Sequence, residues 1–393
     1  MIRVAILGNY PTHYFAERLK CSTIPQAGIS TWIVNFTNAI SKMEDIDLHV
    51  IAKMDQCAKI KQEHNYIYNG CSYHFILSPH LRTATFYLRD CSLLHKTLKT
   101  INPDIVHAHH TDEYALAAIT SRYPAVITVH GIYSKAAKYI NAGNTSRIAI
   151  ASLIERFCLK KGKYIIAINP YAEKIILKSS HGLVYHIENP VNKVYFNIVE
   201  RIEHNTVLFI GVFSPIKGLL ELIEVIENVR KRIHRVTLRL IGFYPSNFEW
   251  YKKKVDYFVS QKDLSDNIQF LGPQNEIEIA DELSKTNCLL VTSKQETAPM
   301  VISEAMAAGK PVVAMDVGGI RYMVQDGVTG YLVPPGDTQA MAERVVRILE
   351  DETLRRTMGE AARKEALQRF HPDLVARKTL AVYEKILHLE HKR

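Results

Sequence analysis

The sequence is short of paired cysteines and of long apolar runs. Its six cysteines are scattered, and no two of them stand at C-x-x-C spacing. This pattern fits neither a disulfide framework nor a zinc site, and it indicates reduced thiols in a cytoplasmic protein. No segment approaches the roughly 20 consecutive apolar residues that span a bilayer. The apolar stretch 2–7 is too short for a signal peptide and lacks its flanks, so it is expected to form a first strand.

The first half of the chain is also poor in acidic residues. Residues 1–196 carry 22 Lys and Arg against 13 Asp and Glu, whereas residues 197–393 carry 27 of each. A basic domain suggests an anionic partner, such as a phosphate-bearing acceptor or a lipid surface at the inner membrane face, although solubility alone is an alternative. Nucleic acid is not an expected partner, because the chain shows no recognition motif and no basic stripe interleaved with aromatics.

A chain of 393 residues is too long for one ordinary core, so two domains are expected. Strand-like apolar segments alternate with helix-like amphipathic segments, which predicts α/β domains. A polar stretch at 197–205 marks the expected boundary. Strands are expected at 2–7, 48–52, 104–108, 125–129, 164–168, 184–187, 206–210, 235–240, 268–272, 288–292 and 311–314, with 66–68 and 73–77 left open.

The stretch 296–319 carries the clearest functional signal. Glu296 and Glu304 stand eight residues apart, and a small-residue helix between Glu304 and Gly309 is followed by an apolar strand and a Gly-Gly loop. Glu296 is expected in the loop after the strand 288–292, at the sheet edge where open α/β sheets bind ligands. A helix start there offers free N–H groups to phosphate, and the two carboxylates suit sugar hydroxyls.

This stretch resembles the signature of family 4 glycosyltransferases, in which E-x7-E precedes a segment like AMAAGKPVVA. Two further segments agree with that family, IGVFSPIKG at 210–218 and DVGGIRYMVQDGVTGYLVPPGD at 316–337. The resemblance is dense from about 206 to 340 and thin before that. It implies the GT-B architecture, with two Rossmann-like, doubly wound α/β domains facing a cleft. Residues 1–196 would bind the acceptor, 197–371 would bind the nucleotide-sugar, and a C-terminal helix in 372–393 would cross back to the first domain.

The resemblance also implies roles for single residues. Lys217 and the N–H groups near Ala298 would face the diphosphate, Glu296 would hold hydroxyls of the donor sugar, Glu304 would hold the ribose, and His130 would lie close to the reaction centre. The catalytic candidates are therefore His130, Glu296 and Lys217. The donor-binding candidates are Gly28, Gly211, Lys217, Glu296, Ala298, Pro299, Met300, Val301 and Glu304, and the acceptor-side candidates are His13, Tyr14, His109 and Asn169.

The chain departs from the family pattern at two positions. Ala27-Gly28 stands where relatives usually have Gly-Gly, and Val212 stands where most carry Arg. Loss of a diphosphate cation would weaken donor binding by about 1–3 kcal/mol. Lys294 is a candidate substitute, and it is equally readable as a solvated loop lysine.

Histidines 107, 109 and 110 are close enough in sequence to suggest a metal site. No acidic ligand stands at metal-site spacing, so a polar rim at the ligand site is preferred. The resemblance to family 4 glycosyltransferases likewise implies that neither a metal nor a cofactor is needed. The alternative for His130 is an ordinary hydrogen-bonded histidine at a strand end.

The expected function is retaining, metal-independent transfer from a UDP- or GDP-sugar to a glycan or lipid-linked acceptor, in synthesis of a bacterial envelope polysaccharide. A non-catalytic, nucleotide-sugar-binding partner subunit is an alternative that Val212 and Ala27 favour. A nucleotide-sugar epimerase of the same fold is another, although it is not expected to carry this E-x7-E run. A sugar phosphorylase needs a pyridoxal lysine motif, which is not found.

Overall fold

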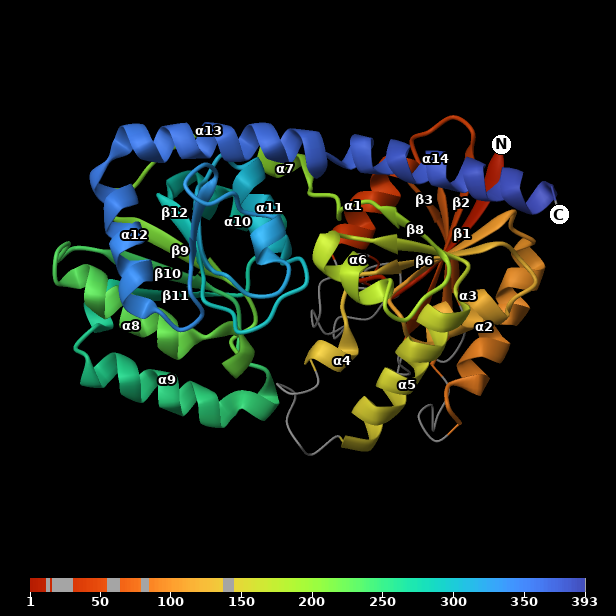
Figure 1. Ribbon diagram of the computed structural model, residues 1–393, viewed down its shortest axis with the longest axis horizontal. Helices are drawn as coiled ribbons and strands as arrows, with labels where there is room; N and C mark the ends of the chain where they lie inside the picture. Colours follow the sequence, from red (N-terminus) through yellow and green to blue (C-terminus); the bar gives the residue numbers. More distant parts are fainter. Residues whose placement is uncertain (12–14, 16–30, 55–63, 79–84, 137–144, 393) are drawn as a thin grey trace. The chain divides into compact units, whose positions relative to one another are not determined.

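The computed structural model describes residues 1–11, 15, 31–54, 64–78, 85–136 and 145–392. The chain divides into two compact units (Figure 1). The first unit consists of Met1–Pro190 together with Pro372–Arg393, and the second consists of Val191–His371. Each unit is built around its own parallel sheet.

The first unit contains an eight-stranded sheet with the order β3-β4-β2-β1-β5-β6-β7-β8. All neighbouring strands are parallel except β3 and β4, which form an antiparallel hairpin through Asn69 and Gly70, both with positive φ as a primed turn requires. The central strand β1 is buried, as expected for a parallel sheet covered on both faces. The strands are β1 (Ile2–Leu7), β2 (Ile46–Met54), β3 (His64–Tyr68), β4 (Cys71–Leu77), β5 (Ile105–His109), β6 (Ala125–Val129), β7 (Tyr164–Ala167) and β8 (Leu183–His186).

Helices cover this sheet, and the last of them comes from the end of the chain. Trp32, Ile33, Phe36 and Ile40 are buried on α1, and α14 packs against α1 while burying Tyr383. The helices of the first unit are α1 (Thr31–Ile40), α2 (Leu88–Ile101), α3 (Glu113–Thr120), α4 (Tyr133–Ala136), α5 (Thr145–Lys161), α6 (Pro170–Ile176) and α14 (Pro372–His391).

The second unit contains a six-stranded, wholly parallel sheet with the order β11-β10-β9-β12-β13-β14. Numbered from its own first strand this is 3-2-1-4-5-6, the doubly wound order of dinucleotide-binding folds. The chain reverses direction across the sheet between β9 and β12, and ligands bind at that point in such sheets. The strands are β9 (Thr206–Ile210), β10 (Thr237–Ile241), β11 (Ile268–Gly272), β12 (Cys288–Val291), β13 (Val312–Met315) and β14 (Gly330–Val333).

Helices lie on both faces of the second sheet, with α8 and α9 on one side and α10 and α11 on the other (Figure 1). The helices are α7 (Lys193–Phe196), α8 (Leu219–Arg230), α9 (Glu249–Gln261), α10 (Glu276–Lys285), α11 (Met300–Ala307), α12 (Thr338–Glu350) and α13 (Glu352–Arg369). Two doubly wound α/β units were predicted from the sequence, and this architecture is confirmed.

The division between the units lies after Pro190, whereas the sequence suggested residue 196. The difference comes from the short helix α7, because its residues Tyr195 and Phe196 are buried in the apolar core of the second unit. Val191 belongs to the same core and donates its N–H to the carbonyl of Phe370. The polar stretch after residue 196 is therefore a surface loop of the second unit.

Candidate functional site

Three loops at the carboxyl edge of the second sheet hold five of the predicted donor residues, Gly211, Lys217, Glu296, Ala298 and Pro299. They follow β9, β12 and β13 and comprise residues 211–218, 292–299 and 316–319. The first two are joined by hydrogen bonds, from the Thr292 hydroxyl to the carbonyl of Lys217 at 3.0 Å and from the N–H of Lys294 to the carbonyl of Ile216 at 2.8 Å.

Lys217 and Glu296 form an ion pair at this edge. The Lys217 Nζ lies 2.5 Å from Glu296 Oε1, and the hydroxyl of Ser293 donates to the same oxygen at 2.8 Å. Lys217 lies at the end of a short 3-10 turn, and the next residue, Gly218, has a φ of 70°. The site therefore places a partly exposed cation beside a largely buried carboxylate.

The Gly-Gly loop packs directly on the backbone of Glu296. The N–H of Gly319 donates to the Glu296 carbonyl at 3.0 Å. A Cβ at Gly318 would lie 1.9 Å from that same carbonyl oxygen. Only glycine permits this close approach, and the carboxylate position depends on it.

We expect Gly318→Ala to destabilise the second unit by more than about 2 kcal/mol, since it combines left-handed strain with a backbone overlap. Gly327→Ala is the matched control, because Gly327 also has positive φ and has no heavy atom within 4 Å of an added Cβ. Its cost should be limited to the strain, about 1 kcal/mol. The measurement is urea unfolding followed by Trp250 in a Trp32→Phe background. Equal costs at the two glycines would contradict the packing argument.

Glu304 lies on α11, one turn beyond the helix start at Met300. Its side chain is buried, and burial raises its pKa to about 8, with a further contribution from Glu276. Among the residues that the structure describes, no acceptor is recorded for the N–H groups of Met300 and Val301 in the first turn. The edge thus combines free helix N–H groups with a carboxyl group held away from water.

Glu276, at the start of α10, is a second carboxyl group near Glu304 that the sequence analysis did not single out. Burial raises its pKa, while a hydrogen bond from the Asn192 side chain at 2.7 Å acts in the opposite direction. Its Oε1 is buried without a partner in the described part of the chain. Asn192 also caps α7 with its side-chain oxygen.

We expect the contribution of Glu304 to the stability of the ligand-free protein to fall as pH rises from about 4.5 to about 8. The folded pKa of Glu304 is raised above its ordinary value of 4.5, so the stabilising protonated form is lost across that interval. Glu304→Gln should remove this contribution to the pH dependence and be more stable than wild type near pH 9 by at least about 1.4 kcal/mol, the equivalent of one pKa unit. Unfolding curves of both proteins across this pH range test it.

Glu360→Gln, at an exposed position on α13, is the control for Glu304→Gln and should leave the pH dependence unchanged. Parallel stability curves for wild type and Glu304→Gln would refute the burial argument.

The departure from the family pattern at Val212 leaves an apolar side chain at this edge, 36% exposed. The neighbouring Gly211 donates its N–H to the carbonyl of Ile241 and so continues the β9 ladder. The candidate substitute Lys294 has its Nζ 2.7 Å from Glu221 Oε1. Its ammonium is therefore engaged with α8 in the ligand-free structure.

In the first unit, histidines gather at the carboxyl ends of β5 and β6. His107 and His109 share one face of β5, and their rings stack with centroids 4.1 Å apart. His130 follows β6, and its Nε2 lies 2.8 Å from His109 Nδ1. The ring of Trp32, from α1, stacks on His130 with centroids 3.5 Å apart.

These histidines are neutral at neutral pH, because burial lowers the pKa of His109 and of His130 well below the usual value. Burial lowers the pKa of His107 to about 3. Its two nitrogens are bonded to the hydroxyls of Tyr383, at 2.6 Å, and Thr128, at 2.7 Å. No group of three or more His, Cys, Asp or Glu in the described ranges is arranged to hold a metal ion.

His110 is a further member of this cluster that sequence analysis only counted with the rim. It has a φ of 76°, which is uncommon for a residue other than glycine and marks functional positions in many proteins. Its ring lies 5.2 Å from that of His130 and 5.5 Å from that of Trp32, and burial lowers its pKa to about 4. Nothing in the sequence indicates this conformation of His110, which only the backbone geometry reveals.

The remaining predicted residues of the first unit are placed differently. Asn169 is buried and caps α6, its side-chain oxygen accepting the N–H of Ala172 at 2.8 Å. His13, Tyr14 and Gly28 lie outside the described residues.

A buried ion cluster lies beside the histidines. Lys53, near the end of β2, pairs with Asp90 of α2 at 2.6 Å and with Glu113 at the start of α3. The lysine side chain is 3% exposed. Burial, with Glu113 next in importance, raises the pKa of the neighbouring Asp112 well above its usual value. Lys53 is thus a buried cation shared by two carboxylates from different helices.

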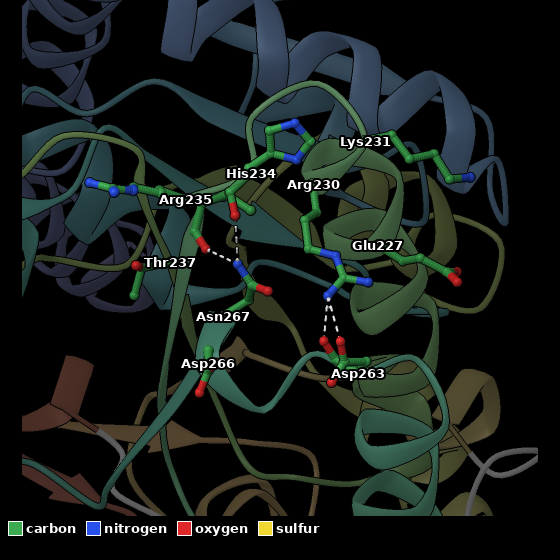
Figure 2. A pocket seen from close by; sticks show the side chains of 10 residues that line it. Glu227, Arg230, Lys231, His234, Arg235, Thr237, Asp263, Asp266 and Asn267 are labelled. Carbon is green, nitrogen blue, oxygen red and sulfur yellow. Dashed lines mark hydrogen bonds and ion pairs between the residues drawn. The ribbon is translucent and has the colours of Figure 1, made fainter.

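A hollow of about 690 Å³ lies at the opposite, amino edge of the second sheet (Figure 2). Arg230 turns toward Asp263 there, and the Asn267 side chain donates to the carbonyls of His234 and Val236. The side chains of Arg235 and Lys231 point away in opposite directions (Figure 2). The polar groups that line this hollow thus hold the turns before β10 and β11, and they do not point toward a common centre.

Two protein-family models match the chain in succession. The model of Glycosyltransferase Family 4 matches residues 27–193, and that of Glycosyl transferases group 1 matches residues 195–365. An uncharacterized glycosyltransferase of Methanocaldococcus jannaschii is 26% identical over 89% of this chain and 93% of its own length. The N-acetyl-alpha-D-glucosaminyl L-malate synthase of Bacillus anthracis is 24% identical over 82% of this chain and 86% of its own length.

Solved structures share the fold. Sucrose-phosphate synthase from Thermosynechococcus elongatus superposes with a TM-score of 0.82, at 19% identity, over 99% of this chain and 100% of that one. HepE of Anabaena, solved in complex with UDP and glucose, gives a TM-score of 0.74, at 18% identity, over 98% and 100%. No helix in the described ranges is both long and apolar enough to cross a bilayer. The two family models show that the chain belongs to family 4 of the glycosyltransferases, and the solved structures show that it has the GT-B fold.

Proposed function

We propose that this glycosyltransferase transfers a sugar, with retention of configuration and without a metal, from a nucleotide-diphosphate-sugar to a glycan or lipid-linked acceptor. The second unit would bind the donor and the first unit the acceptor. The observation that carries the proposal is the Lys217–Glu296 pair, held at the carboxyl edge of a parallel sheet next to the start of α11.

The donor side follows from the charges at this edge. Cleavage of the bond between C1 and the diphosphate builds negative charge on the leaving group, which a fixed cation and helix N–H groups stabilise. Lys217 and the backbone from Ala298 to Val301 would take this role, with Pro299 shaping the turn and Gly211 allowing close approach. When the diphosphate engages Lys217, Glu296 is free to accept hydrogen bonds from sugar hydroxyls.

Glu304 suits the ribose because a buried carboxyl group gains most from hydroxyl partners that replace water. In the ligand-free protein burial keeps it protonated near neutral pH, with its pKa at about 8. Two ribose hydroxyls would favour the ionised form by donating to it. Donor binding should therefore be coupled to proton release.

The acceptor side is proposed for the first unit, where His130, His109, Asn169, His13, Tyr14 and Gly28 are the candidates. His130 would lie close to the reaction centre, and the acceptor hydroxyl would attack C1 from the face that the diphosphate leaves, so no enzyme carboxylate need act as nucleophile. Proximity and stabilisation of the leaving group supply the catalysis.

The acceptor class is supported by charge and by relatives. The surplus of nine basic residues lies in residues 1–196. The phosphatidyl-myo-inositol mannosyltransferase of Mycobacterium tuberculosis is 26% identical over 72% of this chain. A phosphorylated or lipid-linked glycan at an anionic membrane surface, in envelope polysaccharide synthesis, is the corresponding proposal. Failure to sediment with vesicles containing anionic lipid at low salt would remove the membrane part.

The test is a thermal-shift panel with UDP-glucose, GDP-mannose, ADP-glucose and a CMP-sugar. A ligand that binds the folded state raises the melting temperature by mass action. A selective response that Glu304→Ala and Lys217→Ala abolish would identify the donor and its site. UDP- or GDP-sugars are expected, since HepE was solved with UDP-glucose. Slow hydrolysis of the responding sugar would distinguish an enzyme from a non-catalytic binding subunit, and no response to any sugar would count against the proposal.

A further inference from the structure

The outward face of α5, in the first unit, carries apolar and basic side chains together. Leu153 and Phe157 stand four residues apart on this helix and are 62% and 44% exposed. Arg156 and Lys160 are exposed on the same side, because residues three and four apart share one face of a helix. Exposed apolar side chains that adjoin one another and are rimmed by polar groups are characteristic of interaction surfaces.

The packing of α5 in the first unit does not use this face. Ile154, Cys158 and Leu159 are buried on the opposite side of the helix, and α5 packs against α3. The helix is therefore apolar on both sides, and the fold of the unit needs only one of them. The second apolar side is available to a partner.

The exposed charges of α5 are all basic where the structure describes their side chains. They belong to Arg156, Lys160 and Lys161, and no ion pair is recorded for any of them in the described part of the chain. The one acidic residue of the helix, Glu155, is 4% exposed and accepts the N–H of Tyr133 at 2.7 Å. The face thus presents positive charge without neutralisation beside its two apolar side chains.

The exposed face of α9, in the second unit, shows that this combination is not general. Trp250 and Tyr257 are 51% and 61% exposed on α9, and lysines accompany them. However, Glu249 and Asp256 are exposed on the same helix, and Asp256 pairs with Lys252 at 2.7 Å. Helix α9 therefore has similar exposed apolar side chains with nearly balanced charge, and it serves as a control for α5.

We propose that the outward face of α5 docks on a bilayer surface that contains anionic lipid. Leu153 and Phe157 enter the boundary between headgroups and acyl chains, and the three cations lie among the lipid phosphates. A second copy of the chain is a poorer occupant, because symmetric packing of this face would bring unneutralised cations together. The inference rests on the proposed function, which places the acceptor at such a surface, and it names the element that holds the first unit there.

The first test removes charge and measures binding of the full-length protein to vesicles at low salt. The vesicles contain phosphatidylcholine and phosphatidylglycerol in equal amounts. Lys160→Gln combined with Lys161→Gln should lower the binding constant about 25-fold, which is about fivefold for each lysine near an anionic surface. Lys253→Gln combined with Lys254→Gln removes the same charge from α9 and should lower it less than about threefold.

The second test removes the apolar side chains. Leu153→Ser combined with Phe157→Ser should lower the binding constant at least about tenfold, because less apolar surface leaves water on docking. Tyr257→Ser is the control on α9 and should change it less than about twofold. Each variant should keep the melting temperature of wild type, since the replaced side chains are exposed.

A third readout reports insertion directly. The chain has two tryptophans, so Phe157→Trp in a Trp32→Phe, Trp250→Phe background places a single fluorophore on α5. Its emission should move to shorter wavelength when anionic vesicles are added, and brominated acyl chains should quench it. Tyr257→Trp in the same background should show neither change. Vesicles of phosphatidylcholine alone should give only a weak response, because they lack the anionic headgroups.

Equal losses of binding in the α5 and α9 variants would overturn the inference, as would an emission from Phe157→Trp that anionic vesicles leave unchanged. A dimer in sedimentation velocity that Leu153→Ser abolishes would also overturn it, because a second copy would then cover this face. The vesicle measurements contain no sugar. A protein that docks through α5 and responds to no nucleotide-sugar would therefore count against the proposed function alone, whereas a protein that binds nucleotide-sugars and no vesicles would remove only this inference and the membrane-bound acceptor.

Discussion

Replacing Lys217 by methionine should lower kcat/KM for the nucleotide-sugar by about 100- to 1,000-fold, the usual cost of one preorganised group that stabilises developing charge. Methionine keeps most of the side-chain length and removes the cation that lies 2.5 Å from Glu296. Because Val212 supplies no second cation, we expect no neighbouring side chain to replace it. Steady-state kinetics with the sugar selected by the thermal-shift panel give the measurement.

Lys294→Met is the matched control, since Lys294 lies at the same sheet edge and its Nζ is paired with Glu221. It should change kcat/KM by less than about threefold and stability by about 0–1 kcal/mol, as for an exposed ion pair. If Lys294→Met lost as much activity as Lys217→Met, Lys294 would be the substitute for the missing arginine. Retention of activity within tenfold by Lys217→Met would contradict the proposed charge stabilisation.

The donor side of the site was largely predictable, because most of its residues follow one another closely along the chain. Once the strand 288–292 is recognised, Glu296 must lie in the loop after it and Glu304 in the following helix, and both are found there. Parallel strands then bring the loop of Lys217 to the same edge. Their functional roles remain predictions, because the ligand-free structure shows only the arrangement.

Glu276 and His110 could not be found in this way. Glu276 precedes Glu304 by 28 residues, and its nearness depends on how α10 and α11 pack against α7, which no local pattern specifies. His110 is revealed by a backbone dihedral that nothing in the sequence requires. The bond between His109 and His130 depends on the register of β5 and β6, which sets His109 opposite Thr128. Strand alternation places a side chain on one face, but it does not determine that register.

The boundary between the two units also depends on packing that the sequence does not reveal. Polar composition after residue 196 suggested a linker, yet Tyr195 and Phe196 are buried in the second unit. Short helices such as α7 are set by tertiary burial and not by propensity. In contrast, the long apolar strands and amphipathic helices were placed nearly as observed, because burial on both faces of a parallel sheet leaves a strong sequence signal.

Lys53→Met should destabilise the first unit by about 3–5 kcal/mol, because it removes a buried cation that is paired with the carboxylates of both Asp90 and Glu113. The side chain is 3% exposed, so water cannot replace the ammonium. Each unit holds one of the two tryptophans, Trp32 in the first and Trp250 in the second. Urea unfolding in a Trp250→Phe background therefore reports on the first unit alone.

The loss of stability in Lys53→Met should grow as pH rises, and this separates an electrostatic cause from a packing defect. Burial already raises the pKa of Asp112 well above its usual value, and the charge of Lys53 acts in the opposite direction. Removing the lysine raises that pKa further, so the stabilising protonated form is lost as pH increases, and the deficit should be larger near pH 8 than near pH 5.

Lys96→Met, at an exposed position of α2, is the control and should cost less than about 0.5 kcal/mol at either pH. Adding Asp90→Asn and Glu113→Gln to Lys53→Met should restore part of the stability, since neutral amides need no cation. A deficit that is independent of pH and is not relieved by these amides would show that the lysine stem, and not its charge, stabilises this core.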